Sequence, residues 1–155
     1  MEKTNVMRIL DQKKINYKAI CYDNSIVDGL KVASVLNENP NHVFKTLVTV
    51  ANTKEYYVFI ISVTHELDLK KCAKVAEVKS IEMIKQKELL PLTGYIHGGC
   101  SPIGMKKAFK TFIDAEALNY DTIFISAGKV GRQIEICPSD LLKIMNIKIA
   151  DIKTS

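Results

Sequence analysis

The sequence contains no apolar run close to the roughly 20 residues that a bilayer-spanning helix needs, so we expect no membrane segment. Its first ten residues, MEKTNVMRIL, make a poor secretion signal, because acidic and polar side chains interrupt them from the second position onward. Both absences favour a cytoplasmic protein.

Paired cysteines are also missing. The four cysteines stand far apart, at Cys21, Cys72, Cys100 and Cys137, and none forms a C-x-x-C pair. This spacing argues against the common zinc motifs, and disulfides are not expected in a chain without a secretion signal. The three histidines are equally dispersed. We therefore expect no metal site and no cofactor.

Arginine-rich segments and aromatic nucleic-acid motifs are absent as well, and the positive charge comes mainly from lysine. Of the net charge of +5, the stretch 64–110 contributes +4, with nine lysines against five acidic residues. Such a concentration suits a surface that binds a polyanion. A solvated Lys/Glu face would give the same count, and both interpretations stay open.

What is present is typical of one globular domain over 1–155. The chain has 47% hydrophobic and 25% charged residues, enough length for a real core, and no repeat, linker or low-complexity stretch. Helical spacing predicts helices over about 4–16, 28–37, 68–76, 84–90 and 138–145, with one helical turn at 115–119. Apolar and β-branched runs predict strands at 17–22, 45–51, 56–63, 80–83, 108–114, 122–126, 133–137 and 147–152. Strands and helices mix without strict alternation, which favours the α+β class.

Several details of these elements can be tested. The strand over 56–63 is apolar without alternation, so we expect both of its faces to be covered, and 147–152 should be an edge strand. Leu30 and Leu69 should face inward on their helices, Cys72 should be a small core residue, and the helix over 84–90 should stop before Pro91.

A glycine-rich stretch, GYIHGGCSPIGMKK at 94–107, holds four of the seven glycines. Glycine allows positive φ and close backbone approach, so such a loop can direct N–H groups toward an anion. Gly99 and Gly104 have P-loop spacing, but Met105 stands where the lysine should follow, which disfavours a nucleotide-hydrolysing P-loop. An ordinary Gly/Pro turn is the competing interpretation.

This stretch resembles the signature of the YbaK/prolyl-tRNA-synthetase-associated editing-domain family. The runs FKTLV at 44–48 and ISAGK at 125–129 also match the family, in its order and at about its spacing. The resemblance covers nearly the whole chain and implies a curved mixed sheet with helices packed around it. It also implies a deacylase that removes a misattached amino acid, typically cysteine from proline tRNA, with aminoacyl-tRNA as the partner. Prolyl-tRNA synthetase is a further expected partner, and we expect a monomer or weak homodimer.

The resemblance also supplies the candidate site. It implies catalytic roles for Lys45, a pocket lysine, and for Gly98 and Gly99, which would cradle the aminoacyl ester. The substrate-binding residues that it implies are Tyr22, Val27, Ser101, Ser126 and Lys129. Val27 stands near the place where the family has a Phe, and this smaller wall residue puts strict cysteine specificity in question.

The sequence reveals no protein nucleophile, because no His is locally paired with Cys100 or Ser101. In the cysteine-specific members that this chain resembles, the thiol of the substrate attacks its own carbonyl, with the advantage of proximity. Two other functions stay open. One is a deacylase for another small amino acid such as alanine, and the other is a non-catalytic protein that binds tRNA or a synthetase.

Overall fold

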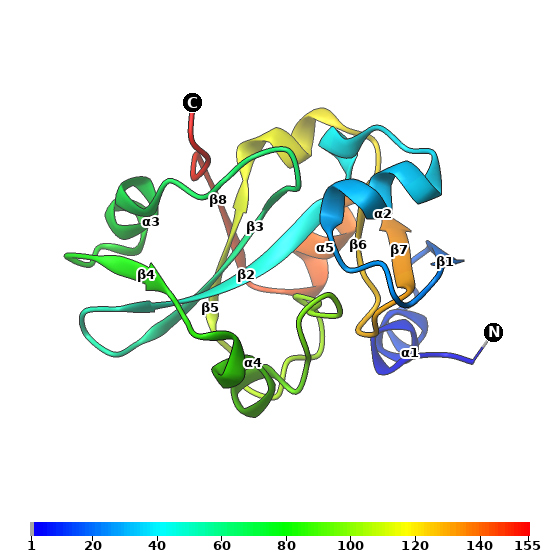
Figure 1. The fold of residues 1–155 in the computed structure, drawn as a ribbon, viewed down its shortest axis with the longest axis horizontal. Helices are drawn as coiled ribbons and strands as arrows, with labels where there is room; N and C mark the ends of the chain where they lie inside the picture. The colour runs from blue at the N-terminus through cyan, green and yellow to red at the C-terminus, as the bar shows by residue number, and fades with distance from the viewer. Residues whose placement is uncertain (1) are drawn as a thin grey trace.

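The computed structural model describes residues 2–155, and its strands form two sheets (Figure 1). The helices are α1 (Asn5–Gln12), α2 (Gly29–Leu36), α3 (Leu69–Ala76), α4 (Gln86–Thr93) and α5 (Pro138–Ile144), with the 3-10 helices η1 (Pro40–His42) and η2 (Ala115–Asn119). The strands are β1 (Tyr17–Cys21), β2 (Phe44–Ala51), β3 (Tyr56–Ser62), β4 (Ile81–Met83), β5 (Lys110–Asp114), β6 (Ile123–Ser126), β7 (Arg132–Ile136) and β8 (Ile147–Ala150). No helix within residues 2–155 is long and apolar enough to span a bilayer.

The smaller sheet is antiparallel with the order β1-β7-β6, and the larger has the order β4-β2-β3-β5-β8. The larger sheet is mixed, because β2 runs antiparallel to β3 and β4 whereas β3, β5 and β8 are parallel. A parallel bridge between Val43 and Phe124 joins the two sheets. The α+β class is thus confirmed, and the expected curved sheet is divided into two sheets that meet at this bridge. The edge position of β8 is also confirmed.

Strand β3 lies at the centre of the core, and its side chains alternate between two hydrophobic clusters. Ile60 packs in the cluster that contains α1 and the smaller sheet. Phe59 and Ile61 pack in the cluster beneath α3, where the Phe59 ring stacks on Phe112 at 5.3 Å between centroids. Because both faces are covered, the strand does not need the polar alternation of a half-exposed sheet. This confirms the prediction drawn from its continuous apolar run.

The helix starts follow their capping residues. Thr4 accepts the N–H of Met7 and caps α1, and Asp68 accepts two N–H groups at the start of α3. Cys72 is fully buried, as predicted. The prediction for Leu30 is wrong, because this side chain is 52% exposed and α2 buries Val32 and Ala33 instead. Leu69 is similarly exposed, at 36%.

The prediction that helix 84–90 stops before Pro91 is also wrong. Helix α4 starts later, at Gln86, and contains Pro91. The Pro91 ring removes only the bond to the carbonyl of Lys87, an exposed residue where water can replace it. The helix ends at Gly94, whose φ of +84° places it in the left-handed region and whose N–H bonds the Leu90 carbonyl at 2.8 Å.

Asp114 attaches the C-terminal segment to the body of the protein. Its carboxylate is 2% exposed, and its two oxygens accept the N–H groups of Ile152 at 3.1 Å and Glu116 at 3.0 Å. Lys153 lies 3.7 Å away and supplies the opposite charge. One buried carboxylate therefore accepts hydrogen bonds from backbone N–H groups at the start of η2 and just after β8.

Replacing Asp114 by alanine should lower the free energy of unfolding by about 1–3 kcal/mol or more, because the buried N–H of Ile152 loses its acceptor and the part-buried N–H of Glu116 loses its acceptor as well. Urea denaturation of Asp114→Ala and of the exposed control Asp121→Ala would measure this. Equal midpoints for the two variants would contradict the role given to Asp114.

Candidate functional site

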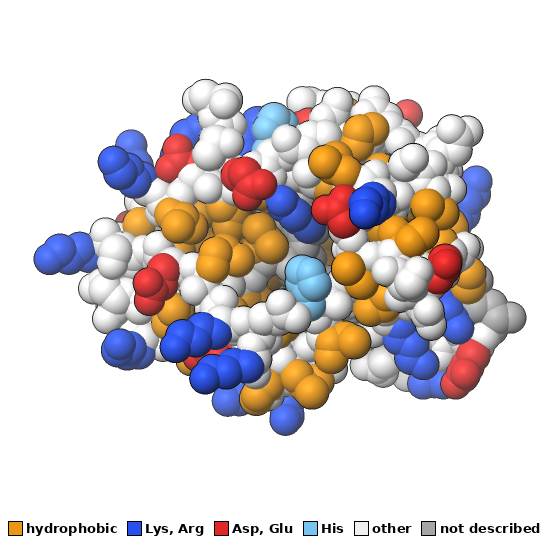
Figure 2. All heavy atoms as spheres, in the orientation of Figure 1, with side chains coloured by type: hydrophobic (Ala, Val, Ile, Leu, Met, Phe, Trp, Pro, Cys, Tyr) orange, Lys and Arg blue, Asp and Glu red, His pale blue; other side chains and the backbone are white. Residues whose placement is uncertain are grey.

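A cavity of about 460 Å³ opens where the two sheets meet. Its walls come from β2, from the segment that leads into α2, from α4 and from the glycine-rich loop between α4 and β5. Figure 2 shows this face hollowed near its middle, with a histidine and a lysine or arginine at the hollow and hydrophobic side chains on both sides. The cavity therefore combines apolar walls with a few charged groups, as small-molecule sites do.

Strand β2 brings Lys45 to the cavity. The 3-10 helix η1, whose start Asn39 caps, ends directly before this strand, and Lys45 is the second residue of β2. The lysine side chain is 29% exposed, and its Nζ lies 4.0 Å from Oε1 of Glu66, which is itself 84% exposed. So long a contact with so exposed a partner is weak. The Lys45 ammonium is thus available to an anion.

The glycine-rich loop packs closely against two other segments. Gly98 has φ +86°, and a Cβ there would lie 2.8 Å from Cγ1 of Val27. A Cβ on Gly99 would lie 3.0 Å from the backbone nitrogen of Val130. Glycine is needed at both positions because the loop approaches a side chain on one side and backbone on the other.

The N–H groups of the two glycines differ in what they can do. The N–H of Gly99 donates to the Ile96 carbonyl at 3.0 Å within the loop. Gly98 lines the cavity, and its N–H donates to no carbonyl within residues 2–155. Of this glycine pair, Gly98 is therefore the one with a donor to offer to a ligand.

The structure brings together five of the eight residues that the sequence suggested. The five that line the cavity are Tyr22, Val27, Lys45, Gly98 and Ser126. Three do not line it: Gly99, Ser101 and Lys129. Ser101 is fully buried, and its Oγ accepts the N–H of Ile103, so it stabilises the turn before Pro102 rather than facing the cavity. Lys129 is exposed, and its backbone lies against Gly99.

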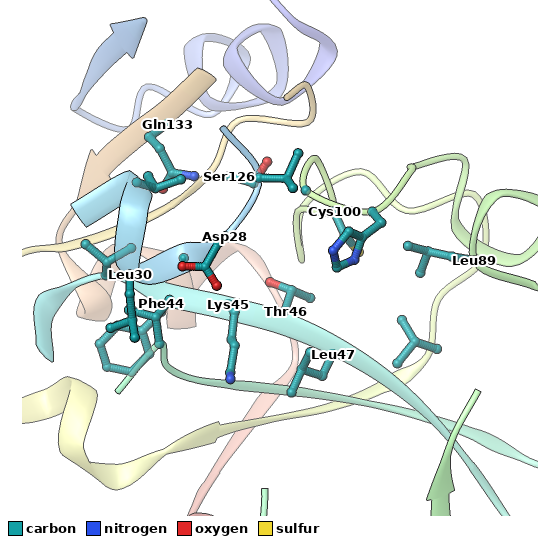
Figure 3. A pocket seen from close by; sticks show the side chains of 18 of the residues that line it. Asp28, Leu30, Phe44, Lys45, Thr46, Leu47, Leu89, Cys100, Ser126 and Gln133 are labelled. Atoms are coloured by element: carbon teal, nitrogen blue, oxygen red, sulfur yellow. The ribbon is translucent and has the colours of Figure 1, made fainter. Parts of the chain in front are cut away.

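The cavity also has polar residues that sequence reasoning did not assign to it. These are Asp28, Thr46, Glu66, Gln86, His97 and Gln133. Gln133 is the cross-strand partner of Ser126, and both side chains reach the cavity from the smaller sheet (Figure 3). A register between β6 and β7 would have revealed Gln133 from the position of Ser126, because directly paired residues project from the same face of a sheet.

Cys100 lines the cavity but is a poor nucleophile. Burial raises the pKa of its thiol to about 12, so the group is neutral near pH 7. Within residues 2–155 no hydrogen bond joins it to His97, which lines the same cavity. The described residues likewise contain no cluster of three His, Cys, Asp or Glu side chains that could hold a metal ion.

The fold and the cavity define an α+β protein with a mixed polar and apolar pocket between its two sheets. Residues 24–144 match the aminoacyl-tRNA editing domain family. The chain belongs to this family, and the resemblance found from its sequence motifs is thereby confirmed.

Individual relatives agree with this assignment. The chain is 44% identical over 155 residues to the Enterococcus faecalis protein named "Putative Cys-tRNA(Pro)/Cys-tRNA(Cys) deacylase EbsC", covering 99% of this chain and 94% of that one. A crystal structure described as "a putative trans-editing enzyme for prolyl tRNA synthetase" superposes with a TM-score of 0.85 at 21% identity, covering all of both chains. The hypothetical protein APE2540 gives a TM-score of 0.91 at 18% identity, covering 97% of this chain and all of that one. At such identities, the structural likenesses establish the fold alone.

The pKa of Cys100 predicts that its sulfur takes no part in chemistry at this site. Cys100→Ser should retain most of the deacylation rate, because a thiol with a pKa of about 12 supplies almost no thiolate below pH 9. Rates of amino acid release, measured at several pH values for wild type and variant, would test this. Loss of activity with an unchanged circular dichroism spectrum would contradict it.

Proposed function

We propose that this protein is a free-standing aminoacyl-tRNA deacylase that releases misattached amino acids, cysteine from Cys-tRNA(Pro) first among them, with Cys-tRNA(Cys) as a further substrate. The observation that carries the proposal is the meeting of Lys45, Gly98 and Ser126 at one cavity from three distant stretches of the chain. Membership of the editing-domain family and 44% identity to the Enterococcus protein support the substrate class.

The chemistry required is cleavage of the ester between the amino acid and the terminal ribose. As the carbonyl carbon is attacked, its oxygen gains negative charge. The free N–H of Gly98 would stabilise that oxygen, and donors of this kind contribute ~2.7–4 kcal/mol in known oxyanion holes. Lys45 supplies a positive charge in the same cavity. This charge could stabilise the developing oxyanion or bind a phosphate group of the tRNA end that carries the amino acid.

The nucleophile comes from the substrate. The cysteine thiolate attacks its own carbonyl carbon, the C–S bond forms and the ester C–O bond breaks. The ribose oxygen takes a proton, and the products are a thiolactone and free tRNA. An intramolecular attack has a large proximity advantage, so the protein needs only to hold the conformer and stabilise charge. The neutral thiol of Cys100 agrees with a mechanism in which the substrate, and not the protein, provides the nucleophile.

Specificity for the side chain depends on the wall at Val27, which lines the cavity close to Gly98. A valine fills less space than an aromatic ring, so a water molecule or another small side chain can enter. This favours alanine as the next substrate to examine. Prolyl-tRNA synthetase as a partner stays a prediction, as does a monomer or weak homodimer.

The proposed function predicts a ranking of substrates. Proline tRNA charged with cysteine should be deacylated far faster than the same tRNA charged with serine, because a thiol is more acidic and more nucleophilic than a hydroxyl. Alanine, which has no nucleophile, should be the slowest. Release of each labelled amino acid over time would give the three rates. Equal rates for cysteine and alanine would point to an activated water, and retention of tRNA without any release would identify a binding protein.

The proposed function also predicts the effect of replacing Lys45. Lys45→Ala should reduce the cysteine release rate at least 100-fold and leave the thermal midpoint nearly unchanged, because the half-exposed lysine makes only a weak ion pair. Lys18→Ala, at an exposed position of β1, serves as the matched control and should behave as wild type. Near wild-type turnover by folded Lys45→Ala would remove Lys45 from the mechanism.

A further inference from the structure

Two buried side-chain atoms lack a hydrogen-bond partner within residues 2–155, and both belong to the cavity. They are Oγ1 of Thr46 and Oε1 of Gln133. Buried polar atoms are almost always paired, because leaving one unpaired costs stability. Two such atoms at one cavity are candidate contacts for a ligand.

Gln133 is held in place by its neighbours. It is 6% exposed, it is paired across the smaller sheet with Ser126, and its Nε2 lies 3.5 Å from the Tyr22 hydroxyl. Figure 3 shows its side chain beside Ser126 at one end of the cavity. With the amide nitrogen directed at Tyr22, the amide oxygen is the acceptor that remains for a ligand.

Thr46 faces the same chamber from the larger sheet. Its side chain and that of Lys45 extend to opposite sides of β2, with Thr46 on the side of Cys100 and Ser126 (Figure 3). The parallel bridge between Val43 and Phe124 brings the two segments together, although it does not itself determine the face on which each side chain lies. Ser126 comes two residues after Phe124, and Thr46 comes three residues after Val43. Because the bridged segments are parallel, both residues lie on the same side of the junction along the strands.

We propose that Gln133 and Thr46 form the subsite that receives the α-ammonium group of the aminoacyl ester. This rests on the proposed function and deepens it. An ammonium group carries three N–H donors and no acceptor. It can therefore donate to the amide oxygen of Gln133, which only accepts, and to the hydroxyl oxygen of Thr46, which can accept as well as donate. The bonds are charge-assisted, and therefore stronger than those between neutral groups.

The surrounding charges and geometry agree with this assignment. The cavity also contains the carboxylates of Asp28 and Glu66, which favour a cation, and Lys45 and His97, which do not. Lys45 extends from the other side of β2 (Figure 3). Because the α-carbon bears both the amine and the ester carbonyl, fixing the ammonium also fixes the carbonyl relative to Gly98.

The test uses Gln133→Met and Thr46→Val, which remove the polar atoms with little change in volume. Cysteinyl-tRNA(Pro) and its N-acetylcysteinyl form are the two substrates, because acetylation removes the charge and leaves the thiol and ester in place. Gln12→Met, an exposed glutamine in α1, is the matched control. Thermal midpoints are measured alongside the rates.

Wild type and Gln12→Met should cleave the free-amine substrate at least tenfold faster than the acetylated one. Each subsite variant should lose at least tenfold in kcat/KM on the free amine and little on the acetylated form, so the preference disappears. Its thermal midpoint should stay equal or rise, because an unpaired buried polar atom has been removed.

Two results would overturn the subsite while leaving the proposed function in place. One is wild-type kcat/KM in both variants, and the other is an equal loss on both substrates, which keeps the preference. A fall in the thermal midpoint would mean that these atoms serve the fold and would also overturn it. Failure of the wild-type protein to release any amino acid would instead overturn the proposed function, and the subsite with it.

Discussion

The cavity depends on the parallel bridge between Val43 and Phe124. Together with the hydrophobic cluster that Phe44 and Ile60 share with the smaller sheet, it fixes the position of β2 relative to β6. The bridge lies just before Lys45 and Thr46 on one strand and just before Ser126 on the other. Beyond it the strands no longer pair, and the space between them becomes the chamber. The contact between the sheets thus brings Thr46 and Ser126, which are 80 positions apart in the sequence, to the same cavity.

The glycine-rich loop closes the chamber by packing rather than by regular structure. Gly98 approaches Val27 and Gly99 approaches the backbone at Val130, so the loop contacts both the segment before α2 and the turn between β6 and β7. The approach of Gly99 to Lys129 joins two of the three stretches that carry the family signature, and all three line or border the cavity. Each contributes one wall, and a Cβ on either glycine would force the walls apart. Of the pair, Gly98 alone lines the cavity, and its N–H donates to no carbonyl within residues 2–155.

Local signals in the sequence predicted most of the elements, because capping residues and apolar periodicity act over a few positions. Thr4, Asp68 and the continuous apolar run of β3 are clear examples. The predictions that failed did so because tertiary contacts, or the local surroundings of a residue, outweigh the signal in the sequence. Leu30 lies at the cavity mouth, where a buried stripe is not required. Pro91 is tolerated because the carbonyl that it leaves without a partner belongs to exposed Lys87, where water can replace the lost bond. Ser101 matched a motif position, but its hydroxyl serves a local turn. Thr46 and Gln133 were missed because strand pairing, which sequence alone does not give, directs them to the cavity.

The distribution of polar groups in this cavity suits a catalyst that supplies no nucleophile. Burial keeps the Cys100 thiol neutral, whereas Lys45, Asp28 and the Gly98 N–H remain available to charges that a ligand brings or develops. The chain also leaves the Thr46 hydroxyl and the Gln133 amide oxygen without a protein partner within residues 2–155. A ligand that can donate to both atoms would gain hydrogen bonds there that other ligands lack. Selection of the reacting conformer then follows from binding, because an amino acid held by its ammonium group has its carbonyl and side chain in fixed directions.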